Sequence, residues 1–187
     1  MRSLTFFIIL ITFSLNLSGQ NTLSVGDKVP VFKAPADDGS TWDLKKHVGK
    51  NYIVIYFYPG AMTGGCTKQA CSYRDHRDDL KDAGAEVIGI SGDKPENIKL
   101  FKEAEKLNFT LLSDEKGEIA KIFGVPTSGG SAFKRTIEGK EYEVVRDLTI
   151  KRWTFVVGKD RKILYKNESV NPEKDTQEVL NFIRQHK

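Results

Sequence analysis

The stretch that decides the fold of this chain is Tyr52-Ile-Val-Ile-Tyr-Phe-Tyr58-Pro59-Gly-Ala-Met-Thr63-Gly-Gly-Cys66-Thr-Lys-Gln-Ala-Cys71. It opens with β-branched and aromatic residues whose apolar side chains point to both faces, which predicts a central strand. Pro59 and Gly60 then indicate a turn, and we expect a helix to begin near Cys66. Only a thiolate is a strong nucleophile, and a helix N-terminus lowers the pKa of a thiol. The stretch therefore predicts a reactive cysteine where a strand turns into a helix.

Cys66 and Cys71 are the only two cysteines, and four residues separate them. This spacing differs from the CxxC pattern of thioredoxin-type exchange and of zinc knuckles. A stabilising disulfide across a short loop and a pair of inert buried thiols both remain open, although closing so short a loop removes little chain entropy. We interpret the spacing as a reactive thiol with a second thiol nearby that can trap its oxidised form.

Strand and helix patterns alternate through the rest of the chain. We expect strands at 52–58, 86–91 and 109–112, and helices at 66–83, after an Asp93 cap with Pro95 in the first turn, and at 115–123. After a loop at 126–130, we expect strands at 133–137 and 142–150, a hairpin formed by 151–157 and 162–165, and a closing helix at 172–186. This order predicts an α/β fold with a central mixed β-sheet flanked by helices.

The N-terminal segment, residues 1–20, resembles a secretory signal peptide. Arg2 supplies the positive start, residues 4–17 are largely apolar, and Ser18 and Gly19 are small residues near a cleavage position. An uncleaved anchor is the alternative, although the segment is short for a membrane span. We therefore expect a periplasmic or secreted domain at residues 22–187, without stable membrane association after cleavage, in an oxidising compartment.

Charge and composition exclude some functions. The formal net charge is +4, and basic and acidic residues alternate along the chain. Because no basic stripe is interleaved with aromatic residues, nucleic-acid binding is not expected.

A reactive thiol also needs a nearby cation. A cysteine of ordinary pKa is only about 3% thiolate at pH 7, and a helix N-terminus supplies only part of the required stabilisation. Arg152 is the best candidate, because its planar guanidinium group can donate hydrogen bonds to two acceptor atoms at once. Arg135 and Arg146 are weaker candidates. Thr63 can direct its hydroxyl toward the sulfur, and Gly64 and Gly65 allow close approach of backbone N–H groups.

These residues resemble the peroxiredoxin family. Pro59-x-x-x-Thr63-x-x-Cys66 is similar to its active-site signature, and Cys66 to Cys71 resembles the peroxiredoxin Q branch, also called bacterioferritin comigratory protein. The likeness covers most of the chain after the N-terminal segment. Its further motifs begin at Val25, Gly89, Asn108, Phe123 and Arg152.

The resemblance implies a thioredoxin-like fold and a thiol peroxidase with no cofactor and no metal site. It implies that Cys66 is the peroxidatic residue, that Thr63 and Arg152 polarise the peroxide, and that Cys71 is the resolving cysteine of an intrachain disulfide. Pro59, Gly65 and Gln69 would belong to the peroxide-binding site, although Gln69 would equally suit a solvated helix position. A thioredoxin-like protein would restore the dithiol, and intrachain resolution suggests a monomer.

Two features depart from the family pattern. Gly64 stands where the branch commonly has proline, and the region from Ser128 to Ile150 is longer than usual, which would reshape the surface for the reductant. Two other functions remain as alternatives: a protein thiol–disulfide oxidoreductase, and a non-catalytic module whose cysteines staple a loop or carry a metal.

Overall fold

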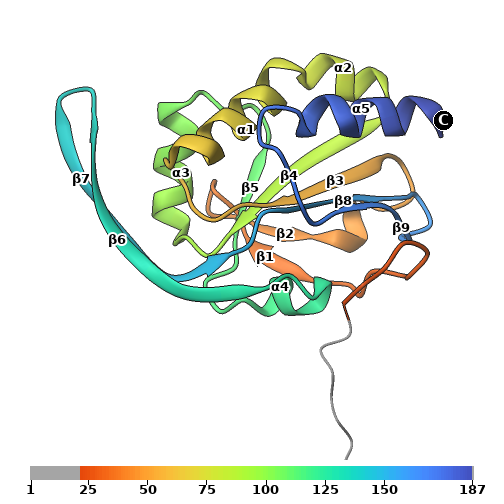
Figure 1. The fold of residues 1–187 in the computed structure, drawn as a ribbon, viewed down its shortest axis with the longest axis horizontal. Helices are drawn as coiled ribbons and strands as arrows, with labels where there is room; N and C mark the ends of the chain where they lie inside the picture. Colours follow the sequence, from red (N-terminus) through yellow and green to blue (C-terminus); the bar gives the residue numbers. More distant parts are fainter. Residues whose placement is uncertain (1–21, 187) are drawn as a thin grey trace, which may run out of the picture.

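The computed structural model describes residues 22–186 (Figure 1). The expected signal peptide, residues 1–20, lies outside them. A central sheet has the strand order β5-β4-β3-β8-β9. Its five strands are β3 (Tyr52–Phe57), β4 (Ala85–Ser91), β5 (Thr110–Ser113), β8 (Trp153–Val157) and β9 (Ile163–Asn167). The first three run parallel, whereas β8 and β9 pair antiparallel, so the predicted mixed sheet is confirmed.

Helices cover both faces of this sheet (Figure 1). The five helices are α1 (Gly64–Asp75), α2 (Arg77–Asp82), α3 (Pro95–Ala104), α4 (Glu118–Phe123) and α5 (Asp175–Gln185). α4 lies on the opposite face from α1 and α5, beside three short elements, β1 (Lys33–Pro35), β2 (Thr41–Asp43) and the 3-10 turn η1 (Leu44–Lys46).

The alternating side chains of β3 divide the core into two clusters. Ile55 and Phe57 pack toward α4, β1 and β2, whereas Val54 and Tyr56 pack toward α1, α3 and α5. All four side chains are fully buried. A strand that is apolar on both faces therefore holds the two layers together, and its carboxyl end delivers the chain to the turn before α1.

The single helix expected at 66–83 is instead two helices, and this prediction was wrong. His76 leaves helical geometry with φ −102° and ψ 18°. Its backbone N–H and its ring Nδ1 both contact the carbonyl oxygen of Ser72, at 3.1 and 3.0 Å. The backbone bond is the last regular helical bond of α1, and the histidine ring contacts the same carbonyl, so the helix breaks at the backbone torsions of His76 itself. The helix that carries both cysteines ends at Asp75.

Asp93 does not cap α3 as expected. Lys94 occupies the N-cap position without a side-chain hydrogen bond, and Pro95 begins the helix. The Asp93 carboxylate instead accepts hydrogen bonds from the backbone N–H of Ala61, at 2.7 Å, and from the hydroxyl of Ser91, at 2.9 Å. It therefore ties the end of β4 to the loop that precedes α1.

A long hairpin extends from the body of the fold (Figure 1). It consists of β6 (Thr127–Ile137) and β7 (Lys140–Ile150), which form a separate two-stranded sheet. Both strands and the turn between them were expected, but β6 includes most of the segment predicted as a loop. Pairing of Thr127 with Ile150 explains the longer strand, because the ladder continues to the base of the hairpin.

Among residues 22–186, no helix has the length and apolar character needed to span a membrane.

The base of the hairpin is packed closely against the β4–α3 connection. A Cβ atom at Gly92 would overlap the carbonyl oxygen of Leu148 in β7. We expect Gly92→Ala to lower the free energy of unfolding by about 1–3 kcal/mol, because backbone atoms must separate to admit the methyl group. Thermal or denaturant unfolding measures this change. Gly129→Ala is the matched control, since a Cβ atom at this β6 position meets nothing within 4 Å. Equal destabilisation by both substitutions would contradict the close packing.

Candidate active site

Cys66 is the third residue of α1, and its side chain is buried with 1% exposure. Thr63 is the N-cap, and its carbonyl accepts the first helical hydrogen bond, from the N–H of Thr67 at 2.8 Å. Met62 enters this turn with φ +60°, a left-handed conformation that non-glycine residues rarely adopt. The sulfur therefore lies in the first helical turn, where free backbone N–H groups favour negative charge.

Arg152 supplies the cation expected from the sequence. Its Nη2 donates a hydrogen bond to Cys66 Sγ at 3.2 Å, from the segment between β7 and β8. A Cβ atom at Gly65 would lie 3.3 Å from the same nitrogen, so glycine leaves room for the guanidinium. A guanidinium that donates to the sulfur favours its anionic form.

Gln69 is buried and contacts Arg152 on the side away from Cys66. The alternative prediction, that Gln69 is a solvent-exposed helix residue, was wrong. Its side chain is fully buried, and its Oε1 accepts a hydrogen bond from Arg152 Nη1. Its Nε2 donates to Asp175 Oδ2 at 2.7 Å. The same oxygen accepts from Tyr73 Oη at 2.7 Å and from Thr154 Oγ1 at 2.9 Å. Burial raises the pKa of Asp175, and the three donated hydrogen bonds oppose this.

The loop before α1 is held by a second arginine, Arg146. Arg146 Nη1 donates to the Pro59 carbonyl at 2.7 Å, and its Nε lies 3.4 Å from Asp93 Oδ1. Gly60 permits this approach, because a Cβ atom there would overlap the guanidinium. Thr63 Oγ1 donates to the Gly60 carbonyl at 3.0 Å. The first turn of α1 is therefore anchored by several independent contacts.

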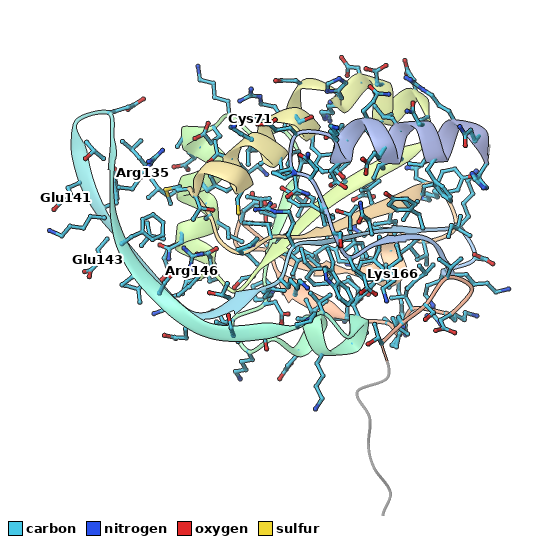
Figure 2. The ribbon with its side chains drawn as sticks, viewed as in Figure 1. Cys71, Arg135, Glu141, Glu143, Arg146 and Lys166 are labelled. Atoms are coloured by element: carbon cyan, nitrogen blue, oxygen red, sulfur yellow. The ribbon has the colours of Figure 1, made fainter. Side chains whose placement is uncertain are left out.

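The three candidate arginines have different positions. Arg152 contacts the sulfur, Arg146 contacts the loop backbone, and Arg135 lies exposed on the hairpin (Figure 2). The choice of Arg152 over the other two agrees with these contacts.

Cys71 is also on α1 but has different neighbours (Figure 2). Both cysteines are free thiols, and Cys71 is only partly buried. Its Sγ donates to Glu105 Oε2 at 3.6 Å. Burial raises the pKa of Cys71, the nearby Arg74 guanidinium lowers it, and the Glu105 carboxylate raises it further. The pKa of Cys71 is therefore raised by its surroundings, which are separate from the Arg152 environment of Cys66.

The site combines a buried sulfur, a guanidinium that contacts it and a second thiol on the same helix. Such an arrangement can stabilise a thiolate and trap an oxidised sulfur. Within residues 22–186, no group of three or more His, Cys, Asp or Glu side chains is arranged to hold a metal ion.

Comparisons with known proteins agree with this geometry. Residues 25–166 match the model of the AhpC/TSA family, and the chain belongs to this family of peroxiredoxins. It is 42% identical to peroxiredoxin Bcp of Escherichia coli K12 over 166 residues, which are 89% of this chain and 99% of that protein. It is 39% identical to the chloroplastic peroxiredoxin Q of Suaeda salsa over 163 residues, covering 87% of this chain and 68% of that one.

A solved structure shares the fold. The crystal structure of peroxidoxin BcpB from Mycobacterium tuberculosis superposes with a TM-score of 0.74 at 32% identity, covering 88% of this chain and 99% of that chain. The fold is thus the thioredoxin-like fold of peroxiredoxins. Peroxiredoxins are thiol peroxidases, and this chain is an enzyme of that class.

Sequence reasoning missed Asp175 and Glu105. Asp175 precedes Val179 and Ile183 by four and eight residues, so helical periodicity places its carboxylate on the buried face of α5. That spacing was the feature of the sequence from which the burial of Asp175 could have been predicted. Nothing in the local sequence relates Glu105 to Cys71, because a tertiary contact between α1 and the end of α3 brings them together.

We expect Glu105→Gln to shift the titration of Cys71. The carboxylate raises the pKa of this thiol, so its removal lowers the pKa, whereas burial, the largest cause, remains. In a Cys66→Ser background, alkylation of Cys71 should therefore begin at lower pH and be faster near neutral pH. Alkylation rates across a pH series measure the shift. Glu103→Gln is the control, because Glu103 is exposed on the same helix. Identical pH profiles for both variants would exclude an effect of Glu105.

Proposed function

We propose that this enzyme reduces hydrogen peroxide and organic hydroperoxides through a Cys66 sulfenic acid, which Cys71 resolves as an intrachain disulfide. The observation that carries this proposal is the 3.2 Å contact between Arg152 Nη2 and the buried sulfur of Cys66 in the first turn of α1. Family membership supports the peroxidase chemistry.

In the first step, the Cys66 thiolate attacks the terminal oxygen of the peroxide. An S–O bond forms, the O–O bond breaks, and the leaving alkoxide or hydroxide takes up a proton to give an alcohol or water. The Arg152 guanidinium stabilises the charge as it moves from sulfur to the leaving oxygen. Thr63 already donates its own proton to the Gly60 carbonyl, so its oxygen can accept the peroxide O–H and orient the substrate.

In the second step, Cys71 attacks the sulfenic acid sulfur and water is released. Residues five apart on an intact helix have Cα atoms about 8.7 Å apart and point about 140° away from each other. A disulfide needs Cα atoms within roughly 7 Å. Since α1 is continuous from Gly64 to Asp75, part of it must unwind before the bond can form.

A thioredoxin-like dithiol protein would then reduce the disulfide and restore both thiols. We further propose that the enzyme acts as a monomer in the periplasm or outside the cell, on the basis of intrachain resolution and the signal-like segment at residues 1–20. Protein thiol–disulfide exchange through Cys66 receives less support, because a large protein disulfide has little access to a sulfur that is 1% exposed.

Replacing each cysteine separates the two steps. Cys66→Ser should abolish peroxide consumption, because no nucleophile remains. Cys71→Ser should consume one equivalent of peroxide rapidly and then not turn over, because the sulfenic acid has no thiol partner. Stopped-flow tryptophan fluorescence follows the first step, since Trp153 is adjacent to Arg152, and mass spectrometry identifies the Cys66–Cys71 bond in the wild type. Multiple turnovers by Cys71→Ser without an added thiol would contradict the resolving role.

Oxidation should loosen residues 63–74. Forming the disulfide removes helical hydrogen bonds of α1 and the contacts that Gln69 and Tyr73 make with Asp175. Hydrogen exchange in this segment should therefore be faster in the disulfide form than in the dithiol form, whereas exchange in α4, on the opposite face of the sheet (Figure 1), should change little. Equal exchange of α1 in the two forms would show that the bond forms by another movement.

A further inference from the structure

Asp175 is a charged residue in an unusual place. Its side chain is fully buried at the start of α5, between α1 and β8. Its Oδ2 accepts hydrogen bonds from Gln69, Tyr73 and Thr154, at 2.7, 2.7 and 2.9 Å. A buried carboxylate is costly unless hydrogen-bond donors satisfy it. The family signature that surrounds Cys66 does not include this residue.

Asp175 is connected to the sulfur through two side chains. Gln69 Nε2 donates to Asp175, Gln69 Oε1 accepts from Arg152 Nη1, and Arg152 Nη2 donates to Cys66 Sγ. Cys66, Gln69 and Tyr73 lie at positions i, i+3 and i+7 of α1, so one face of the helix carries the sulfur and both of these donors.

The direction of the Gln69 amide follows from its partners. A guanidinium can only donate hydrogen bonds, and an ionised carboxylate can only accept them. The amide therefore presents its nitrogen to Asp175 and its oxygen to Arg152. Without an acceptor at position 175, the amide loses the contact that fixes this direction, and a rotated amide would place its NH₂ group against the guanidinium.

We propose that Asp175 is a positioning residue of the peroxidatic site, which orients the Gln69 amide so that Arg152 is held against Cys66. This inference rests on the proposed function, in which Cys66 attacks the peroxide. Asp175 does not touch the reacting atoms. It acts on the reaction only through the glutamine and the arginine.

The proposal also explains why residue 69 of α1 is glutamine rather than glutamate. A glutamate in place of Gln69 would pair well with Arg152, but its second oxygen would face the Asp175 carboxylate with no proton donor between them. Two buried carboxylates in contact repel each other or must share a proton. Glutamine offers both a donor and an acceptor, so Gln69 and Asp175 form a matched pair.

Exchanging the members of this pair tests the proposal. Three changes are compared in a Cys71→Ser background, where only the Cys66 thiol remains: Gln69→Glu, Asp175→Asn, and both together. Gln69→Glu should slow the single-turnover reaction with hydrogen peroxide by about tenfold or more, because it places a second buried carboxylate against Asp175 with no proton donor between the two. The pH at which the thiolate absorbance of Cys66 appears should rise as well.

The double variant should recover most of the rate and of the absorbance profile. The introduced asparagine can donate its Nδ2 to the introduced glutamate, which reverses that hydrogen bond and leaves one buried carboxylate in the pair. The hydroxyls of Tyr73 and Thr154, which donate to the same atom of Asp175, must then rotate so that they no longer donate to it. Asp175→Asn alone should have a smaller effect, because the asparagine oxygen can still accept from Gln69. A double variant as slow as Gln69→Glu, or a Gln69→Glu variant that reacts like the parent, would overturn the inference.

Tyr73→Phe controls for a purely structural effect. It removes one hydrogen bond to the same carboxylate but leaves the link from Asp175 to Gln69 intact. It should lower the melting temperature with much less change in the pH profile of the thiolate than Gln69→Glu. If Tyr73→Phe shifted the pH profile of the Cys66 thiolate by a comparable amount, Asp175 would have only a structural role.

The parent protein separates this inference from the proposed function. If the Cys71→Ser parent does not react with hydrogen peroxide at Cys66, the proposed function itself is wrong. If the parent reacts and the exchange variants match it, only the role of Asp175 is wrong.

Discussion

The hydrogen bond from Arg152 to Cys66 is the interaction on which the rest of the site depends. A sulfur with 1% exposure is cut off from water, so a negative charge on it requires a cation and aligned dipoles supplied by the protein. The first turn of α1 supplies the dipoles, and Arg152 supplies the cation. Gly65 leaves room for the guanidinium, and Gln69 fixes its other nitrogen. Several features of the sequence near the turn thus serve one electrostatic requirement.

A second arginine holds the loop that precedes α1. Arg146 is 4% exposed, and it reaches from the hairpin to the Pro59 carbonyl and to Asp93. Asp93 in turn holds the N–H of Ala61. Because Arg152 follows directly after β7, both cations come from one continuous segment of chain. The hairpin of β6 and β7 is therefore linked to the active-site loop through Arg146.

Much of the fold could be predicted from local patterns. The apolar run at Tyr52 marked the central strand, and the Pro-Gly turn before Cys66 marked the start of α1. The expected pairing of Cys66 with Arg152 came from chemistry and from a family resemblance, and their contact agrees with it. The break at His76 could not be predicted, because it lies in the backbone torsions of one residue and no glycine or proline stands there to mark it. The partners of Asp93, Glu105 and Asp175 are distant in sequence, and local propensity carries no information about them.

The break at His76 has a consequence for survival under oxidant stress. Because α1 ends at Asp75, separately from α2, melting of the cysteine helix need not spread into the next one. The anchors on α1, from Asp175 to Gln69 and Tyr73, nevertheless slow that melting. While α1 remains folded, a sulfenic acid at Cys66 stays apart from Cys71 and is exposed to a second peroxide molecule, which would convert it irreversibly to the sulfinic acid. In the proposed cycle, the stability of this one short helix therefore sets how much oxidant the enzyme can withstand before it inactivates itself.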